Sequence, residues 1–162
     1  MSAILSVAVL AALLGSAIIG GGFYVFSSFI MKALARIPAP QGISAMQSIN
    51  VVVINRSFLG VFIGTAALCL ALVAAAVKAW GQAWASWVLA AAIVYVVGTF
   101  LVTLFGNVPL NNRLAKVVAA DRGGESVWRY YLERWTWLNT LRTAAAVSST
   151  LLFALALMNS AP

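Results

Sequence analysis

Long apolar runs separated by short polar segments dominate the chain. Each run is about as long as the ~20 helical residues that cross the hydrocarbon core of a bilayer. The alternation of apolar and polar positions typical of barrel strands is missing. The pattern therefore predicts an all-α integral membrane protein, a single domain over residues 1–162 that forms a bundle of four transmembrane helices. The predicted spans are residues 4–30, 57–77, 84–106 and 136–158.

The first apolar run could instead be a cleaved signal peptide. A signal peptide has a basic N-terminal region followed by an apolar region of about 7–15 residues. Here the chain carries no charged side chain from Met1 to Met31, and the apolar run from Ile4 to Ile30 is much longer. We therefore expect the first run to be a retained helix.

The composition excludes a soluble protein, because 64% of the residues are hydrophobic and 8% are charged, whereas soluble domains carry about 25% charged residues. The formal net charge is +7, and the uneven distribution of the basic residues among the connections predicts that the basic connections lie in the cytoplasm and both termini outside it. It indicates topology and attraction to anionic membrane lipids rather than nucleic-acid binding. The first and third connections hold or adjoin Lys32, Arg36, Arg56, Arg113, Lys116, Arg122, Arg129, Arg134 and Arg142, against Lys78 alone in the second.

The basic connections are long enough to hold helical extensions. Pro38-Ala39-Pro40 should end the first helix and restart the chain. Apolar positions at helical spacing over residues 43–53 predict a cytoplasmic extension of the second helix. Residues 110–120 similarly extend the third helix, whereas residues 78–82 form a tight hairpin between the second and third spans.

Glycines mark two of the spans. Gly60 and Gly64 form a Gly-x-x-x-Gly motif in the second span, and Gly15 and Gly20 lie in the first. Small residues let helix backbones approach closely in lipid. We expect these glycines to pack inside one bundle; a homo-oligomer interface is the alternative.

The composition also limits the chemistry. The chain has no histidine, which excludes Ser–His and Cys–His nucleophiles, and its single cysteine, Cys69, has no thiol partner. The acidic residues Asp121, Glu125 and Glu133 lie together outside the bilayer centre. We therefore expect neither a metal site nor a bound cofactor.

Asparagines surround a proline at the end of the third span. Pro109 should leave the Phe105 carbonyl without its helical partner, and Asn107 and Asn111 share one face of a continuous helix. These amides could repair the kinked backbone or cap the helix. They could also form the polar floor of a pocket that holds a ligand oxygen.

The most unusual segment precedes and enters the fourth span. Trp128, Trp135, Asn139 and Arg142 fall on one narrow helical stripe. Arg142 could extend its side chain to the interface. Alternatively, its guanidinium could point inward, pair with the amides and stabilise an enolate or phenolate, with the two tryptophans as flat walls for an aromatic ligand.

Further polar and aromatic residues lie at the same predicted depth. Phe23, Phe26 and Ser27 end the first span and can share a face, and Asn50 lies just before the second. Packing in the core is an equally good explanation for the two phenylalanines. The convergence of polar groups from all four helices predicts a cytoplasm-facing pocket more strongly than any single residue.

These residues together resemble the anthrone oxygenase family, small four-helix membrane proteins of which many bacterial members have no assigned role. The resemblance covers nearly the whole chain and implies a bacterial inner-membrane protein. It is carried by Phe23-x-x-Phe26-Ser27, by Asn50, by Asn107-x-Pro109-x-Asn111 and by Trp128-x6-Trp135-x3-Asn139-x-x-Arg142.

The resemblance implies a cofactor-free monooxygenase that converts a tricyclic anthrone to an anthraquinone with O2. An apolar, flat pocket with donors for the oxyanion suits that reaction. Non-catalytic binding or transport of a lipophilic aromatic molecule, or a structural membrane subunit, are the alternatives. The expected catalytic residues are Arg142, Asn139, Asn107 and Asn111, and the expected substrate-binding residues are Trp128, Trp135, Phe23, Phe26, Ser27 and Asn50.

Overall fold

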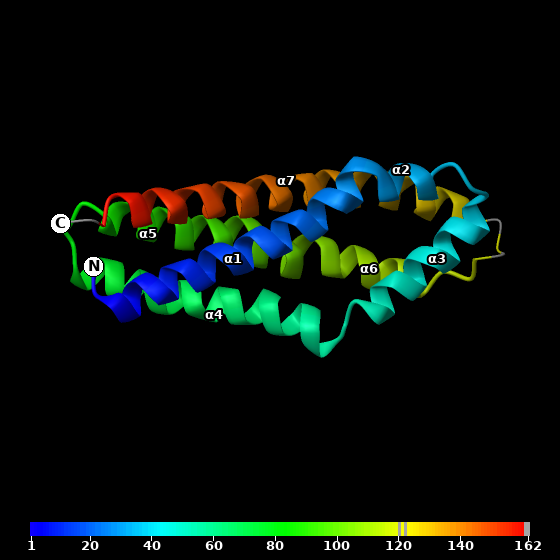
Figure 1. Cartoon of the computed structure of the whole chain (residues 1–162). Coiled ribbons are helices and arrows are strands. Elements are labelled where there is room, and N and C mark those ends of the chain that lie inside the picture. Colours follow the sequence, from blue (N-terminus) through cyan, green and yellow to red (C-terminus); the bar gives the residue numbers. More distant parts are fainter. Residues whose placement is uncertain (120, 122, 161–162) are drawn as a thin grey trace.

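A computed structural model describes residues 1–119, 121 and 123–160 of the chain, and every regular element among them is a helix (Figure 1). Four continuous helical stretches are long and apolar enough to cross a membrane. The all-α class and the four membrane helices predicted from the sequence are therefore confirmed. The stretches are Ala3–Leu34, Arg56–Lys78, Ala85–Ala115 and Gly124–Met158.

Two of these stretches contain π-helical turns. The first consists of α1 (Ala3–Val25), η1 (Phe26–Ile30) and α2 (Met31–Leu34), and the third of α5 (Ala85–Ile93), η2 (Val94–Leu101), η3 (Thr103–Asn107) and α6 (Val108–Ala115). The second stretch is α4 (Arg56–Lys78) and the fourth is α7 (Gly124–Met158), both regular α-helices.

The bundle is organised around α7. This long helix packs along α1 and also contacts α5, η2 and η3 (Figure 1). The α4–α5 hairpin turns at Gly81, whose φ of 99° is a left-handed conformation that glycine adopts without strain. The amino group of Met1 donates a 3.5 Å hydrogen bond to the Ser160 carbonyl, so α1 begins beside the end of α7. We call this the hairpin end of the bundle.

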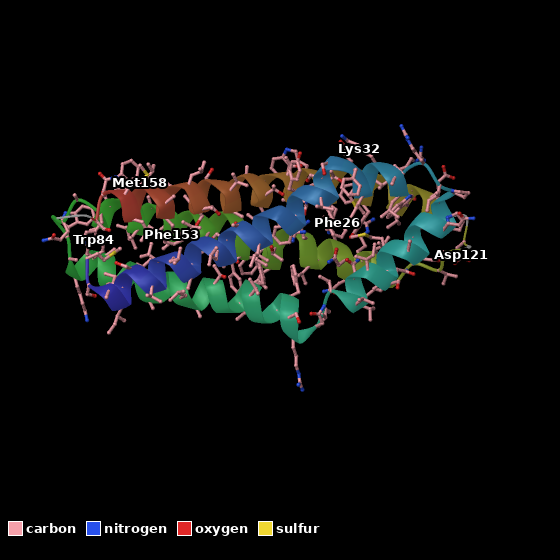
Figure 2. All side chains as sticks on the ribbon, in the orientation of Figure 1. Phe26, Lys32, Trp84, Asp121, Phe153 and Met158 are labelled. Carbon is pink, nitrogen blue, oxygen red and sulfur yellow. The ribbon has the colours of Figure 1, made fainter. Side chains whose placement is uncertain are left out.

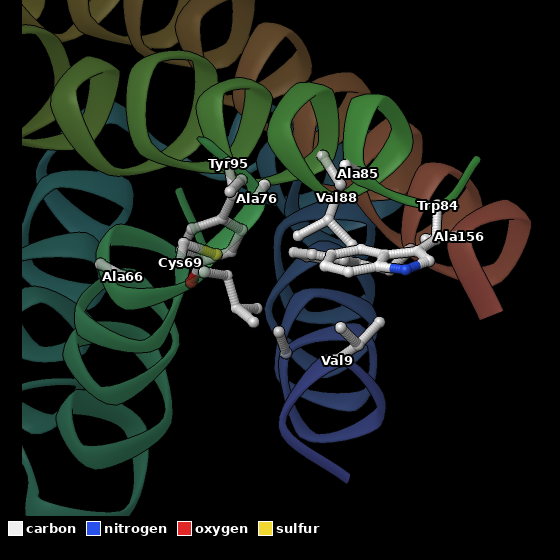
Figure 3. Packing of buried hydrophobic residues seen from close by; sticks show 14 residues of the cluster. Val9, Ala66, Cys69, Ala76, Trp84, Ala85, Val88, Tyr95 and Ala156 are labelled. Carbon is white, nitrogen blue, oxygen red and sulfur yellow. The ribbon is translucent and has the colours of Figure 1, made fainter. Parts of the chain in front are cut away.

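Alanines make up half of the buried core near the hairpin end, which also contains the rings of Trp84, Tyr95 and Phe153 (Figure 3). A Cβ atom on Gly15 would overlap Thr65 of α4, and one on Gly20 would lie 3.2 Å from Ala146 of α7. These two glycines therefore allow close helix contact, as predicted. The buried residues of this cluster include Val9, Ala12, Ala66, Cys69, Leu72, Ala76, Trp84, Ala85, Val88, Ala91, Ala92, Tyr95, Phe153 and Ala156.

Gly60 and Gly64 do not follow that prediction. A Cβ on either one would meet no atom within 4 Å, since both face outward from α4. The expected packing of this motif inside the bundle is wrong for the single chain. Thr65 and Ala66, on the opposite side of α4, make the inward contacts instead.

The opposite end of the bundle, which we call the basic end, extends beyond α4 (Figures 1 and 2). It consists of α2, α3 (Ala39–Val52), α6 and the first turns of α7. They enclose a second core with three large aromatic rings from α7. The buried members are Met31, Ile43, Met46, Leu114, Trp128, Tyr131 and Trp135.

The extensions differ from the predicted ones in two places. Residues 43–53 do not continue the second span, because Asn55 is extended and its side-chain oxygen accepts a 2.9 Å hydrogen bond from the Phe58 N–H, which starts α4 as a new helix. The segment is a separate helix, α3, that begins at the predicted Pro38–Pro40 break. The third stretch ends at Ala115 rather than near residue 120; Ala120 itself lies outside the described residues.

Candidate functional site

The candidate site lies between the two cores, beside a small third cluster of Ile19, Phe23 and Phe62. Two π-helical segments, η1 and η3, approach α7 at this level. π-Helical turns inside α-helices occur frequently at functional sites. In η3 the backbone hydrogen bonds shift register just before Pro109, so that the Val108 N–H donates to the Thr103 carbonyl. The disturbance predicted around this proline is thus a widened turn.

Arg142 lies at the centre of the site and points inward. Its side chain is 5% exposed, so it does not extend to the interface. Its Nε and Nη2 donate to Asn139 Oδ1 at 3.0 and 2.8 Å, and its Nη1 donates to Thr103 Oγ1 at 3.2 Å. A guanidinium has five N–H groups; two of them have no hydrogen-bond partner among the described residues.

Among the described residues, no carboxylate accepts a hydrogen bond from this guanidinium. The acceptors of Arg142 are a neutral amide and a neutral hydroxyl. The acidic residue nearest to it in sequence, Glu133, precedes it by nine positions, which is about 13 Å along a helix. Aromatic rings surround the charge instead: the guanidinium carbon lies 3.7 Å from the centroid of Phe23 and 5.1 Å from that of Trp135. The site is therefore suited to an anion.

Asn139 holds the arginine in place. Its Oδ1 accepts both Arg142 bonds, and its Nδ2 donates to the Phe23 carbonyl and to Ser27 Oγ, each at 2.7 Å. Ser27 Oγ also lies 2.9 Å from Thr140 Oγ1. Both ends of the amide are thus occupied, which fixes its orientation and links the first span to α7.

A second network adjoins the first through Trp135. Asn111 Oδ1 accepts hydrogen bonds from Trp135 Nε1 and from the Tyr131 hydroxyl, both at 2.8 Å. Asn50 Nδ2 donates to the same hydroxyl at 3.4 Å. Tyr131 stacks between Trp128 and Trp135, with ring centroids 5.7 and 6.0 Å away. The amides of this network hold the aromatic rings.

Asn107 has an unusual buried oxygen. Its Nδ2 donates a 3.2 Å bond to the Trp135 carbonyl. Its Oδ1 is fully buried and has no hydrogen-bond partner among the residues that the structure describes. A buried acceptor left without a donor costs about 1–3 kcal/mol. Such a group indicates a place where a ligand hydroxyl or water could donate a bond.

Comparison with known protein families shows to which family the chain belongs. Residues 55–152, well over half of the chain, match the anthrone oxygenase family. The chain belongs to the anthrone oxygenase family. No curated protein and no solved structure is significantly similar to it.

The matched segment of this anthrone oxygenase family member contains the polar centre of the site. Arg142, Asn139 and the η3 residues lie within residues 55–152, whereas Phe23 and Ser27 come from the first span outside it. The structure brings these parts together through Asn139. Four more of the residues expected at the site also lie in this region: Asn107, Asn111, Trp135 and Phe26. The ring centroids of Phe26 and Trp135 are 5.7 Å apart.

Other residues are placed differently or were not expected. Trp128 lies one ring beyond Tyr131 in the stack and packs on Gly42, and Asn50 reaches only the Tyr131 hydroxyl. Sequence reasoning missed Tyr131 and Thr103. Tyr131 was recognisable, because it stands three residues after Trp128 and four before Trp135 on the same stripe. Thr103 had no comparable signal.

The predicted open pocket is replaced by a packed cluster. Phe23 covers the guanidinium directly, and neither of two depressions on the surface of the described chain is lined by Arg142 or Asn139. One depression, of about 710 Å³, lies on the outer face of α4 around Gly60 and Gly64. The other, of about 370 Å³, lies between η3–α6 and α7. A ligand that reaches Arg142 would therefore have to displace the Phe23 ring.

Proposed function

We propose that this protein oxygenates a flat, lipophilic anthrone or phenol with O2 and without a cofactor, at the site around Arg142. One observation carries the proposal. The acceptors of the buried Arg142 guanidinium are a neutral amide and a neutral hydroxyl, two of its N–H groups have no partner among the described residues, and the rings of Phe23 and Trp135 lie close to it. An anionic aromatic molecule would complete this environment in both charge and shape.

The reaction needs little from the protein besides binding and charge stabilisation. Loss of one ring C–H proton converts an anthrone to its enolate, whose oxygen accepts hydrogen bonds from Arg142. The electron-rich ring carbon then adds O2, and the protonated hydroperoxide loses water to leave a new carbonyl. One oxygen atom enters the quinone and the other leaves as water, and the substrate supplies all the electrons. The proton passes to water or to a neighbouring phenolate of the substrate.

The neutral groups of the site would position the substrate. Asn107 Oδ1, which has no partner among the described residues, would accept a hydrogen bond from a substrate hydroxyl. Asn139 keeps the guanidinium in a fixed orientation, and donors fixed in advance stabilise a developing oxyanion most effectively. Asn139 therefore acts as a positioning residue, whereas Arg142 contacts the reacting oxygen.

The test measures conversion of anthrone to anthraquinone by the purified protein in lipid vesicles, against the spontaneous reaction. We expect wild type to exceed the background. Arg142→Ala should lower kcat by about 10²–10³, the loss typical of one oxyanion donor, while its circular dichroism stays unchanged. Arg36→Ala, which removes an exposed arginine at the same end of the bundle, is the matched control and should retain wild-type activity.

Two results would contradict the proposal in different ways. Wild-type turnover equal to the background would remove the oxygenase activity and leave binding or transport of a lipophilic molecule as the function. Turnover above background that is equal in wild type and Arg142→Ala would place the chemistry elsewhere. Rescue of Arg142→Ala by added guanidinium would support the assigned role.

A further inference from the structure

A groove on the lipid-facing surface adjoins the candidate site. It has a volume of about 370 Å³ and lies between the η3–α6 segment and α7. Phe105, on its η3 side, is 77% exposed, so the groove opens toward the membrane. Its lining residues are Val102, Phe105, Gly106, Pro109, Leu110, Tyr130, Arg134 and Leu138.

The groove and the Arg142 site lie on opposite sides of one seam between helices. Gly106 and Leu138 line the groove, and the residues that follow them, Asn107 and Asn139, belong to the buried site. Val102 and Arg134 also line the groove, and the residues that follow them, Thr103 and Trp135, also belong to the buried networks. The residues that line the groove therefore form a layer between the outer surface of the bundle and the buried site.

That layer is thin at Gly106. A Cβ atom there would lie 3.1 Å from one terminal methyl of Leu138 and 3.3 Å from the other. Leu138 thus covers bare backbone, and rotation of its side chain moves the cover without moving a helix. The π-helical η3 holds Gly106 against Leu138.

The mouth of the groove carries positive charge next to aromatic rings. Arg134 lines the groove, is exposed and lies 5.0 Å from the centroid of Trp137. Tyr130, also in the lining, lies 5.3 Å from the guanidinium carbon of Arg113. An apolar groove with cations at its polar edge is complementary to a flat molecule whose acidic hydroxyl stays near the interface.

We propose that this groove is a separate binding site for lipophilic phenols and the route by which they enter the Arg142 site from the membrane. The phenol oxygen binds Arg134, the ring system lies along Val102 and Phe105, and displacement of Leu138 from Gly106 opens the seam. The entry role rests on the proposed function, whereas binding at the groove does not.

The experiment uses a probe that cannot be oxygenated, 1,8-dihydroxyanthraquinone, with the whole protein in detergent and equilibrium dialysis as the readout. Val102→Phe fills the groove and should weaken binding about tenfold or more. Val97→Phe is the matched control, because Val97 is 54% exposed on the same stretch and outside the groove. Arg134→Gln should weaken binding of the dihydroxy probe but not of its dimethyl ether.

The same variants are then assayed for turnover. Val102→Phe should lower kcat/KM about tenfold and leave kcat at saturating substrate near wild type, since it restricts entry and not chemistry. Leu138→Ala should raise kcat/KM, whereas Leu141→Ala, an exposed leucine of the same helix, should not.

The outcomes separate the two proposals. Turnover at background together with Val102-dependent probe binding would reject the oxygenase and keep the groove site. Turnover above background with probe binding and kcat/KM both insensitive to Val102→Phe would reject the groove and keep the oxygenase. Retention of a phospholipid that depends on Val102 and is not displaced by the probe would also overturn this assignment of the groove.

Discussion

The cores at the two ends of the bundle are filled by different sets of residues. Near the hairpin end, alanines and glycines bring the helices together around the rings of Trp84, Tyr95 and Phe153. The buried hydroxyls there have partners: Ser149 Oγ donates to the Ala91 carbonyl at 2.9 Å and lies 3.4 Å from Ser16 Oγ. At the basic end, the core is a stack of tryptophan and tyrosine rings from α7, and buried amides and the Arg142 guanidinium lie where this stack meets the rest of the bundle.

The two regions differ in how completely their buried polar groups are hydrogen-bonded. Among the described residues, the buried side-chain oxygen without a partner belongs to Asn107, at the junction with the basic end, and the spare N–H groups of Arg142 lie at the same level. Membrane helices bear the cost of buried ionisable groups mainly where those groups have a function. We therefore propose that the hairpin end is a scaffold and that the junction with the basic end is the part that receives a ligand.

The largest effect should come from overpacking the scaffold. Gly15→Leu places a side chain where Thr65 already lies and should lower the free energy of unfolding by about 3 kcal/mol, measured by reversible unfolding in mixed micelles. Gly22→Leu is the control on the same helix, because a Cβ on Gly22 meets no atom within 4 Å. Equal losses in both variants would show that the contact with Thr65 does not decide the result.

Asn107→Leu tests whether the buried Asn107 oxygen without a partner binds a ligand. It removes one 3.2 Å hydrogen bond and one oxygen that lacks a partner, so the free energy of unfolding should change by less than about 1 kcal/mol. Turnover of a hydroxylated substrate should nevertheless fall about tenfold, or about 1.4 kcal/mol. A loss of stability with unchanged turnover would assign the amide to the scaffold.

Tyr131→Phe keeps the aromatic stack and removes its hydroxyl. Asn111 Oδ1 keeps its bond from Trp135, so the free energy of unfolding should fall by about 1 kcal/mol, the value of one hydrogen bond. Tyr130→Phe, at an exposed position next to it, should cost less. Equal values for the two would mean that the second network contributes nothing to the basic end.

The smallest effect is expected on the outer face of α4. Gly60→Leu adds a side chain in open space and should change the free energy of unfolding by less than about 0.5 kcal/mol. A larger loss that depends on protein concentration would indicate that a second copy covers this face. That result would revive the homo-oligomer interpretation of the Gly-x-x-x-Gly motif.

Hydrophobic pattern alone predicted the class and the number of membrane helices, because bilayer thickness constrains helix length directly. The stripe that carries Asn139 and Arg142 was also visible, since a regular α-helix fixes its own faces. Where the helix is irregular, prediction failed. The role of Thr103 depends on the π-helical register of η3, and the break at Asn55 depends on a cap that propensity does not distinguish from a loop asparagine.

The spacing of Gly60 and Gly64 in the sequence also does not predict that both face outward from the bundle. A Gly-x-x-x-Gly motif predicts that one face of a helix is flat, but it does not predict which neighbour packs on that face. In this chain α4 turns Thr65 and Ala66 toward α1 and leaves the flat face outside.

The position of Arg142 also has a consequence for how the protein is made. α7 is the least apolar of the four spans, with a mean hydropathy of 1.6 against 2.4–2.5 for the others, and it carries an arginine within the membrane. Of these four spans, it also leaves the ribosome after the other three. The groups that receive it, Phe23, Ser27 and Thr103, belong to spans made earlier. Biosynthesis thus delivers the most polar helix to a bilayer that already contains its partners, and insertion of α7 should depend on them.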